Sequence, residues 1–239
     1  LAICAGLTGI RLAFEGRIEL AVSMVLLAAF LDGLDGRVAR ALKATSKFGA
    51  EMDSLADIVN FGLAPGLLLY AFLLNEAGAL GWTAALLYTT GCALRLARFN
   101  TMLDDPNRPK WHSAFFVGVP APAGAALVML PMYVSFTGLN VNLPQITAGF
   151  ASIYLVLVGL LMASRIPTWS GKGAGIRVPR SYAIPIIMVM VLYVAMLVSF
   201  FWETLTVTIL AYYVSIPFSW REFSKRSNRE ARQFGPPQG

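Results

Sequence analysis

Residues 32–57 read DGLDGRVARALKATSKFGAEMDSLAD, and they place two pairs of aspartates, Asp32/Asp35 and Asp53/Asp57, between long apolar runs. A carboxylate at the centre of a membrane helix costs roughly 2.5 kcal/mol or more, so it normally faces a cavity, a metal ion or a counter-charge. We therefore expect this stretch to be the active site.

The composition of the 239 residues is that of an integral membrane protein. Hydrophobic residues make up 57% of the chain, charged residues only 13%, and the mean hydropathy is +0.65. A soluble domain carries about 25% charged residues, so the composition argues against a soluble globular enzyme. Cys4 and Cys92 lie far apart without metal-ligand spacing, which predicts neither a disulfide framework nor a zinc site. We expect an all-α, polytopic membrane bundle.

Eight apolar runs approach the length that a membrane-spanning helix needs, roughly 20 residues. The first run is short and is expected to be a truncated span, and the last two either span separately or form one bent hairpin. Together they predict a single membrane domain, residues 1–220, followed by a basic and partly disordered cytoplasmic tail, residues 221–239. The runs are 1–14, 18–43, 47–74, 82–101, 116–137, 145–164, 182–201 and 203–220.

The basic residues fall at alternate connections between these runs. All of them except Arg11 and Arg17 lie at the connections that follow the second, fourth, sixth and eighth runs. By the positive-inside rule these connections are cytoplasmic, which places the aspartate stretch on the cytoplasmic side of the membrane. A basic face of this kind attracts anionic lipid headgroups. No basic stripe accompanies a recognisable nucleic-acid-binding fold, so we expect no nucleic-acid partner.

Helical spacing brings the four carboxylates together. Asp32 and Asp35 are three residues apart in the second run, and Asp53 and Asp57 are four apart in the third, so each pair shares one helix face. The short turn around residues 45 and 46 makes the two helices antiparallel neighbours. We expect the four carboxylates to converge on one place.

Four carboxylates without His or Cys predict a hard divalent cation, because all-oxygen ligation suits Mg²⁺ or Mn²⁺ and four acidic groups can hold two such ions. A pair of metal ions is a recurrent device for displacement at phosphorus. Gly33, Gly36 and Gly49 would let a bulky phosphorylated ligand approach the backbone. Arg40 is placed one turn beyond Gly36, where it would neutralise phosphate oxygens.

These residues resemble the signature of the CDP-alcohol phosphotransferase family, D-x2-D-G-x2-A-R-x8-G-x3-D-x3-D. Every fixed position is met. The matching residues are Asp32, Asp35, Gly36, Ala39, Arg40, Gly49, Asp53 and Asp57.

The resemblance implies transfer of a phosphoryl-linked lipid from a CDP-activated donor to an alcohol, with release of CMP. It implies that Asp32, Asp35 and Asp53 bind metal and that Asp57 lies near the metal ions and is the base for the acceptor hydroxyl. The residues implied to bind the CDP moiety and its diphosphate are Gly33, Gly36, Arg40, Thr45 and Gly49.

Within the family, the chain is most similar to the phosphatidylserine synthases of bacteria and archaea. The similarity rests on SKFGAEMDSLADIVNFGLAP (46–65), RLARFN (95–100) and SRIPTWSGK (164–172). It implies CDP-diacylglycerol as donor, L-serine as acceptor, a homodimer, and a site on the inner face of the cytoplasmic membrane. The residues expected to bind serine are Arg95, Arg98, Asn100, Arg165 and Lys172, and Arg95 and Arg98 would hold either the serine carboxylate or the donor phosphate.

Two other functions stay open at this point. The same chemistry with another acceptor, glycerol 3-phosphate or inositol phosphate, needs a cationic acceptor pocket, which Arg95, Arg98 and Arg165 would supply. A cation transporter would use the carboxylates as a coupling site. The transporter leaves unexplained why all four aspartates cluster near one end of their helices.

Overall fold

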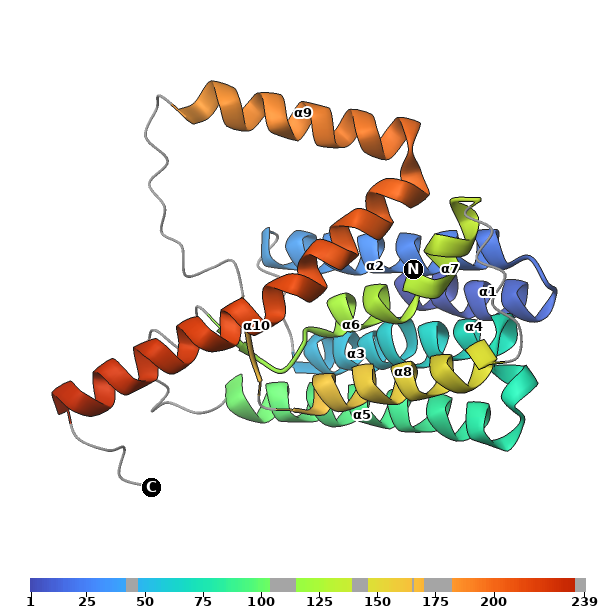
Figure 1. The fold of residues 1–239 in the computed structure, drawn as a ribbon, viewed down its shortest axis with the longest axis horizontal. Coiled ribbons are helices and arrows are strands. Elements are labelled where there is room, and N and C mark those ends of the chain that lie inside the picture. The colour runs from blue at the N-terminus through green and yellow to red at the C-terminus, as the bar shows by residue number, and fades with distance from the viewer. Residues whose placement is uncertain (42–46, 104–114, 139–145, 165, 170–181, 235–239) are drawn as a thin grey trace.

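The computed structural model describes residues 1–41, 47–103, 115–138, 146–164, 166–169 and 182–234, and it confirms the all-α prediction (Figure 1). A two-stranded antiparallel sheet, which the sequence analysis did not predict, pairs Phe115–Val117 (β1) with Pro167–Trp169 (β2). The helices are α1 Ala2–Phe14, α2 Ile18–Ala41, α3 Lys47–Asp57, the π-helix η1 Ile58–Leu63, α4 Ala64–Phe72, the 3-10 helix η2 Leu74–Ala77, α5 Ala79–Leu103, α6 Ala121–Val128, α7 Leu130–Phe136, α8 Ile146–Ala163, α9 Ala183–Ser199 and α10 Phe201–Phe234.

Each expected span contains helix, but the number of membrane crossings stays a prediction. Among the described residues, one continuous helix, Phe48–Phe72, is long and apolar enough to cross a membrane by length and composition. The expected span 116–137 is divided into α6 and α7, where Pro131 lies in the first turn of the second helix. The expected region 182–220 is two helices that meet at Phe200, and the second continues to Phe234. The basic segment 221–232, expected as part of a tail, is therefore helical.

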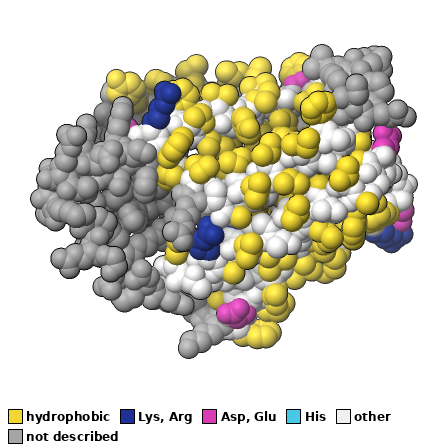
Figure 2. All heavy atoms as spheres, turned by 60° about the horizontal axis from the view of Figure 1, so that its bottom comes forward, with side chains coloured by type: hydrophobic (Ala, Val, Ile, Leu, Met, Phe, Trp, Pro, Cys, Tyr) yellow, Lys and Arg dark blue, Asp and Glu magenta, His cyan; other side chains and the backbone are white. Residues whose placement is uncertain are grey.

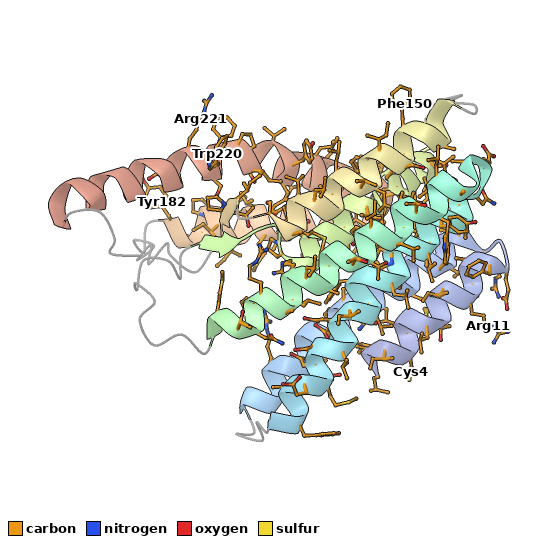
Figure 3. All side chains as sticks on the ribbon, turned by 90° about the horizontal axis from the view of Figure 1, so that it is seen from below. Cys4, Arg11, Phe150, Tyr182, Trp220 and Arg221 are labelled. Carbon is orange, nitrogen blue, oxygen red and sulfur yellow. The ribbon has the colours of Figure 1, made fainter. Side chains whose placement is uncertain are left out.

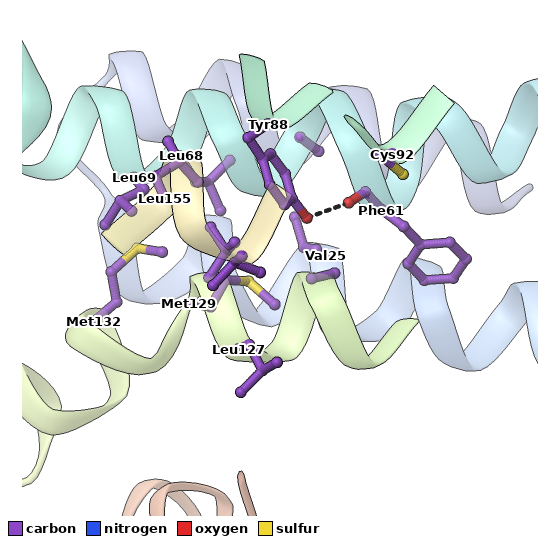
Figure 4. Packing of buried hydrophobic residues seen from close by; sticks show 14 of the residues in the cluster. Val25, Phe61, Leu68, Leu69, Tyr88, Cys92, Leu127, Met129, Met132 and Leu155 are labelled. Carbon is purple, nitrogen blue, oxygen red and sulfur yellow. Dashed lines mark hydrogen bonds between the residues drawn. The ribbon is translucent and has the colours of Figure 1, made fainter. Parts of the chain in front are cut away.

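The helix that carries Asp53 and Asp57 changes its winding directly after Asp57. Pro65 has no N–H to donate to the carbonyl of Phe61, four residues before it, and the π-helix η1 ends at Leu63, two residues before the proline. The hydroxyl of Tyr88 on α5 donates to that Phe61 carbonyl at 2.6 Å in the buried core (Figure 4). A side chain of α5 therefore satisfies the backbone group that the proline leaves without its helical donor.

The core lies where α1, α2, α4, α5, α6 and α8 pack together, and large apolar side chains fill it (Figure 4). Among the fully buried residues are Phe61, Leu68, Leu69, Tyr88, Leu127, Met129, Met132 and Leu155. The outer surface is also apolar, because on the face shown in Figure 2 hydrophobic side chains are numerous and charged ones are few. Such extended exposed apolar surface is typical of contact with lipid or a partner.

Helix α9 lies apart from the bundle, and α10 crosses back over it (Figure 1). Two hydrogen bonds hold α10 in place. Near its start, the Trp202 indole N–H donates to Glu19 on α2 at 3.0 Å, and nearer its end the Ser219 hydroxyl donates to the Pro167 carbonyl of β2 at 3.1 Å. Arg11 and Arg221, labelled in Figure 3, lie toward opposite ends of the molecule.

Helices α5 and α8 cross at a pair of glycines. A Cβ atom on Gly91 would lie 2.6 Å from the Gly159 carbonyl oxygen, and a Cβ on Gly159 would lie 2.9 Å from the Tyr88 Cα. Both distances are shorter than van der Waals contact. The two backbones therefore touch in a way that only glycine permits, as is common between membrane helices.

We expect Gly159→Ala to lower the free energy of unfolding by about 1–3 kcal/mol, because the added methyl group overpacks the crossing. The matched control is Gly149→Ala on the same helix, where a Cβ would meet nothing within 4 Å. Alanine there should leave stability unchanged or raise it slightly, since alanine favours helix. The measurement is the thermal unfolding midpoint of each variant in detergent, and equal shifts for both would contradict the tight crossing.

Candidate functional site

The structure brings the two aspartate pairs together. Asp32 and Asp35 lie on α2 and Asp53 on α3, and all three line one open hollow of about 180 Å³. Asp57 lies one turn beyond Asp53, and its carboxyl group comes close to that of Asp32. The four carboxylates therefore lie close together, as the helical spacing predicts.

The first turn of α1 completes this hollow. Leu1, Ala2 and Ile3 line it on one side, and Met52 and Ala56 of α3 line it between the carboxylates. The hollow is therefore lined both by carboxylates and by apolar side chains. A ligand in this hollow would meet both.

The carboxylates repel one another. The charges of Asp53 and Asp35 both repel the carboxylate of Asp32, and the charge of Asp53 repels the carboxylate of Asp57. The cluster as it stands therefore carries an excess of negative charge, which a cation would neutralise.

The donor set fits divalent metal ions of the Mg²⁺ or Mn²⁺ type, because the four side chains of the cluster all supply carboxylate oxygen. In the described part of the chain, however, no three or more Asp, Glu, His or Cys side chains already surround one point as a ready metal cage. The carboxylates are close enough to repel one another. Binding of a metal ion would have to draw them inward.

Of the residues expected to bind the CDP moiety, Gly33 has open space beside it. A Cβ on Gly33 would meet nothing within 4 Å, so the protein itself gives no packing reason for glycine there and leaves room for a ligand. Gly36 is half-buried on α2, and Gly49 is exposed on α3. Of Arg40 the structure describes only the helical backbone, and Thr45 lies outside the described residues.

Of the described residues expected to bind serine, Arg95 is the one that interacts electrostatically with Asp57. It is buried on α5, with 8% of its surface exposed, and it attracts Asp57 electrostatically. On its other side it lies within electrostatic reach of Tyr212 on α10. The sequence analysis did not single out Tyr212, because no local motif connects an aromatic residue of an apolar run to RLARFN.

Arg98 and Asn100 have structural partners. Arg98 Nη1 donates to the carbonyls of Ala163 at 2.7 Å and Ser164 at 3.2 Å, so it caps the C-terminal end of α8. Asn100 Nδ2 donates to Ser54 Oγ at 2.9 Å and joins α5 to α3 next to Asp53. These contacts make both residues positioning groups for the helices around the cluster. Arg165 and Lys172, also expected to bind serine, lie outside the described residues.

Comparison with known proteins identifies the family. The model of the CDP-alcohol phosphatidyltransferase family matches residues 1–164, more than half of the chain. The chain belongs to the CDP-alcohol phosphatidyltransferase family. This confirms the resemblance drawn from the signature, and the matched range contains both aspartate pairs. CDP-alcohol phosphatidyltransferases are membrane-associated, join a CDP-activated substrate to an alcohol acceptor and generally depend on a divalent metal ion.

Several relatives in this family carry the same name. A CDP-diacylglycerol–serine O-phosphatidyltransferase of Mycobacterium leprae is 44% identical over 225 residues, which are 92% of this chain and 71% of the relative. One of Mycobacterium tuberculosis is 42% identical over 227 residues, 92% of this chain and 76% of the relative. One of Helicobacter pylori is 40% identical over 169 residues, 69% of this chain and 67% of the relative.

Added Mn²⁺ should stabilise the protein, because it relieves the repulsion in the acidic cluster and binds only where the carboxylates are assembled. Free Mn²⁺ at a concentration one hundred times its Kd would add about 2.7 kcal/mol to the free energy of unfolding. The double variant Asp32→Asn/Asp53→Asn should be more stable than the parent without metal and should lose the response to Mn²⁺. The measurement is the thermal midpoint with and without Mn²⁺ after EDTA treatment.

Glu51→Gln is the control for that experiment, because Glu51 is an exposed acidic residue of α3 that does not line the hollow. It should keep the full Mn²⁺ response. A response that survives in the double variant, or disappears equally in the control, would show that the ions bind elsewhere.

Proposed function

We propose that this protein transfers the phosphatidyl group of CDP-diacylglycerol to the hydroxyl of L-serine, giving phosphatidylserine and CMP. The observation that carries the proposal is the 42–44% identity, over 92% of this chain, to mycobacterial CDP-diacylglycerol–serine O-phosphatidyltransferases. The assembled signature aspartates support it, because they provide the acidic cluster that such a displacement needs.

Asp32, Asp35, Asp53 and Asp57 would hold two divalent cations, Mg²⁺ or Mn²⁺, which when bound stabilise the charge of the diphosphate and of the transition state. Gly33, Gly36 and Gly49 are proposed to let the CDP moiety approach the backbone. Arg40 and Thr45 are proposed to contact its phosphates.

Asp57 is the base of the proposed reaction. It takes the proton of the serine hydroxyl while the hydroxyl oxygen forms a bond to the phosphorus that carries diacylglycerol. The bond from that phosphorus to the bridging oxygen of the diphosphate breaks, and CMP leaves with the electron pair. Arg95, beside Asp57, supplies positive charge where the acceptor must lie. No covalent enzyme intermediate is needed.

The protein is proposed to lie in a bacterial or archaeal cytoplasmic membrane with eight crossings and the acidic cluster on the cytoplasmic side. The alternating basic connections support this orientation. The acyl chains of the donor would then occupy the inner leaflet, and serine would enter from the cytosol. A homodimer is proposed by analogy with the family.

The deciding experiment is CMP release by purified protein in detergent with CDP-diacylglycerol and Mg²⁺ or Mn²⁺. We compare L-serine, glycerol 3-phosphate, inositol phosphate and no acceptor. Release that requires both serine and metal is expected, and EDTA should abolish it. Release with only a phosphorylated acceptor would overturn the choice of serine, and no release with any acceptor would overturn the transferase itself.

Asp57→Asn should lower kcat by about 10²–10⁴-fold, because the amide cannot accept the hydroxyl proton. Binding of CDP-diacylglycerol should remain, since the amide keeps the size of the side chain and three carboxylates remain at the hollow. Donor binding is measured by equilibrium titration alongside CMP release, with Glu51→Gln as the matched control. Turnover near that of the parent would rule out Asp57 as the base.

A further inference from the structure

Arg95 has hydrogen-bonding capacity that the protein does not use. A guanidinium group has five N–H donors and normally finds partners when it is buried. Arg95 is buried, yet its Nε has no partner among the described residues. Its attraction to Asp57 is electrostatic, and the ion pair in direct contact within the described part of the chain is a different one, Arg11 with Glu15.

Tyr212 presents a second unused donor beside Arg95. Its hydroxyl is buried and forms no hydrogen bond with any described residue. It approaches Thr168 of β2, but the Thr168 hydroxyl donates to the Gly118 carbonyl at 2.9 Å. A buried hydroxyl without a partner costs roughly 1–3 kcal/mol, so a bound ligand that accepts from Tyr212 would recover that free energy.

The position of Tyr212 is fixed by the two anchors of α10. It lies between Trp202, bonded to Glu19 of α2, and Ser219, bonded to Pro167 of β2. Its ring packs partly buried against the core. The hydroxyl is therefore held near Arg95 by the helix as a whole.

A guanidinium group with an unpartnered Nε and a hydroxyl group without a partner together match an oxyanion. Arg95 does not line the hollow formed by Asp32, Asp35 and Asp53, but it is the basic neighbour of Asp57. The diphosphate of the donor belongs with the carboxylates of the hollow, while the acceptor hydroxyl must reach Asp57. In a small hydroxy amino acid the carboxylate is only a few bonds from that hydroxyl, which brings it to Arg95.

We propose that Arg95 and Tyr212 form the subsite for the carboxylate of the acceptor, and that Tyr212 is a specificity-determining residue on α10. This inference rests on the proposed function. Residue 212 lies beyond the range 1–164 that the family model matches. A specificity residue outside the shared domain is consistent with a family whose members differ in acceptor.

Tyr212→Phe tests the proposal, because it removes only the hydroxyl. It should raise the KM for L-serine by about tenfold or more, because one hydrogen bond to a charged group is lost. It should leave the KM for CDP-diacylglycerol unchanged. Arg95→Lys keeps the charge but loses the planar fork, and it should raise the same KM further. Tyr213→Phe is the control, since Tyr213 is 47% exposed on the same helix, and it should leave both constants unchanged.

Serinol, in which a hydroxymethyl group replaces the carboxylate, separates recognition from folding. Its inhibition constant against serine should be the same in the parent and in Tyr212→Phe, because serinol lacks the group that Tyr212 binds. A structural defect would weaken both ligands alike. The thermal midpoint and the Mn²⁺ response of each variant are measured on the same samples.

Three outcomes would overturn the inference. The first is an unchanged KM for serine in Tyr212→Phe, and the second is an equal loss of affinity for serinol and for serine. The third is a rise in the KM for CDP-diacylglycerol, which would assign Arg95 and Tyr212 to a donor phosphate. Each of them presupposes that the parent releases CMP with serine. Absence of that release is a failure of the proposed function instead, so the two failures are distinguishable.

Discussion

Mutual repulsion of carboxylates held in an apolar bundle is the constraint on which the rest of the structure depends. Asp32, Asp35, Asp53 and Asp57 are brought close by two neighbouring helices, and little basic charge lies among them in the described structure. Such an arrangement costs folding energy unless a cation compensates it. The packing around it supplies the rigidity, with the glycine crossing of α5 and α8 and the α5 hydroxyl of Tyr88 fixing the helix that carries Asp53 and Asp57.

The acidic cluster was predictable because it is encoded by short-range spacing. Residues three and four apart share a helix face whatever the tertiary context, and a short turn makes the two helices neighbours. The family followed from the same eight positions. The two-stranded sheet of β1 and β2 was not predictable in this way. Its strands are only three residues long each, and about 50 residues separate them in the sequence.

Roles of the basic residues were harder to predict. Arg95 and Arg98 look equivalent in the sequence, three residues apart at one helix end. In the fold, one is buried beside Asp57 and the other caps α8 through carbonyls more than sixty residues away. Spacing gives the face of a helix, but the element that packs against that face is a property of the whole chain. Tyr212 was not predicted for the same reason, because local spacing does not show which residues of α10 lie near Arg95.

The division of the site between distant segments has a consequence for how such enzymes diversify. The acidic pairs come from consecutive helices within residues 32–57, whereas Tyr212 comes from α10, the last helix of the chain. If the proposed subsite is correct, substitutions in α10 would alter which alcohol is accepted while the helices that carry the aspartates keep their geometry. In evolutionary terms, acceptor choice would then change independently of the acidic cluster.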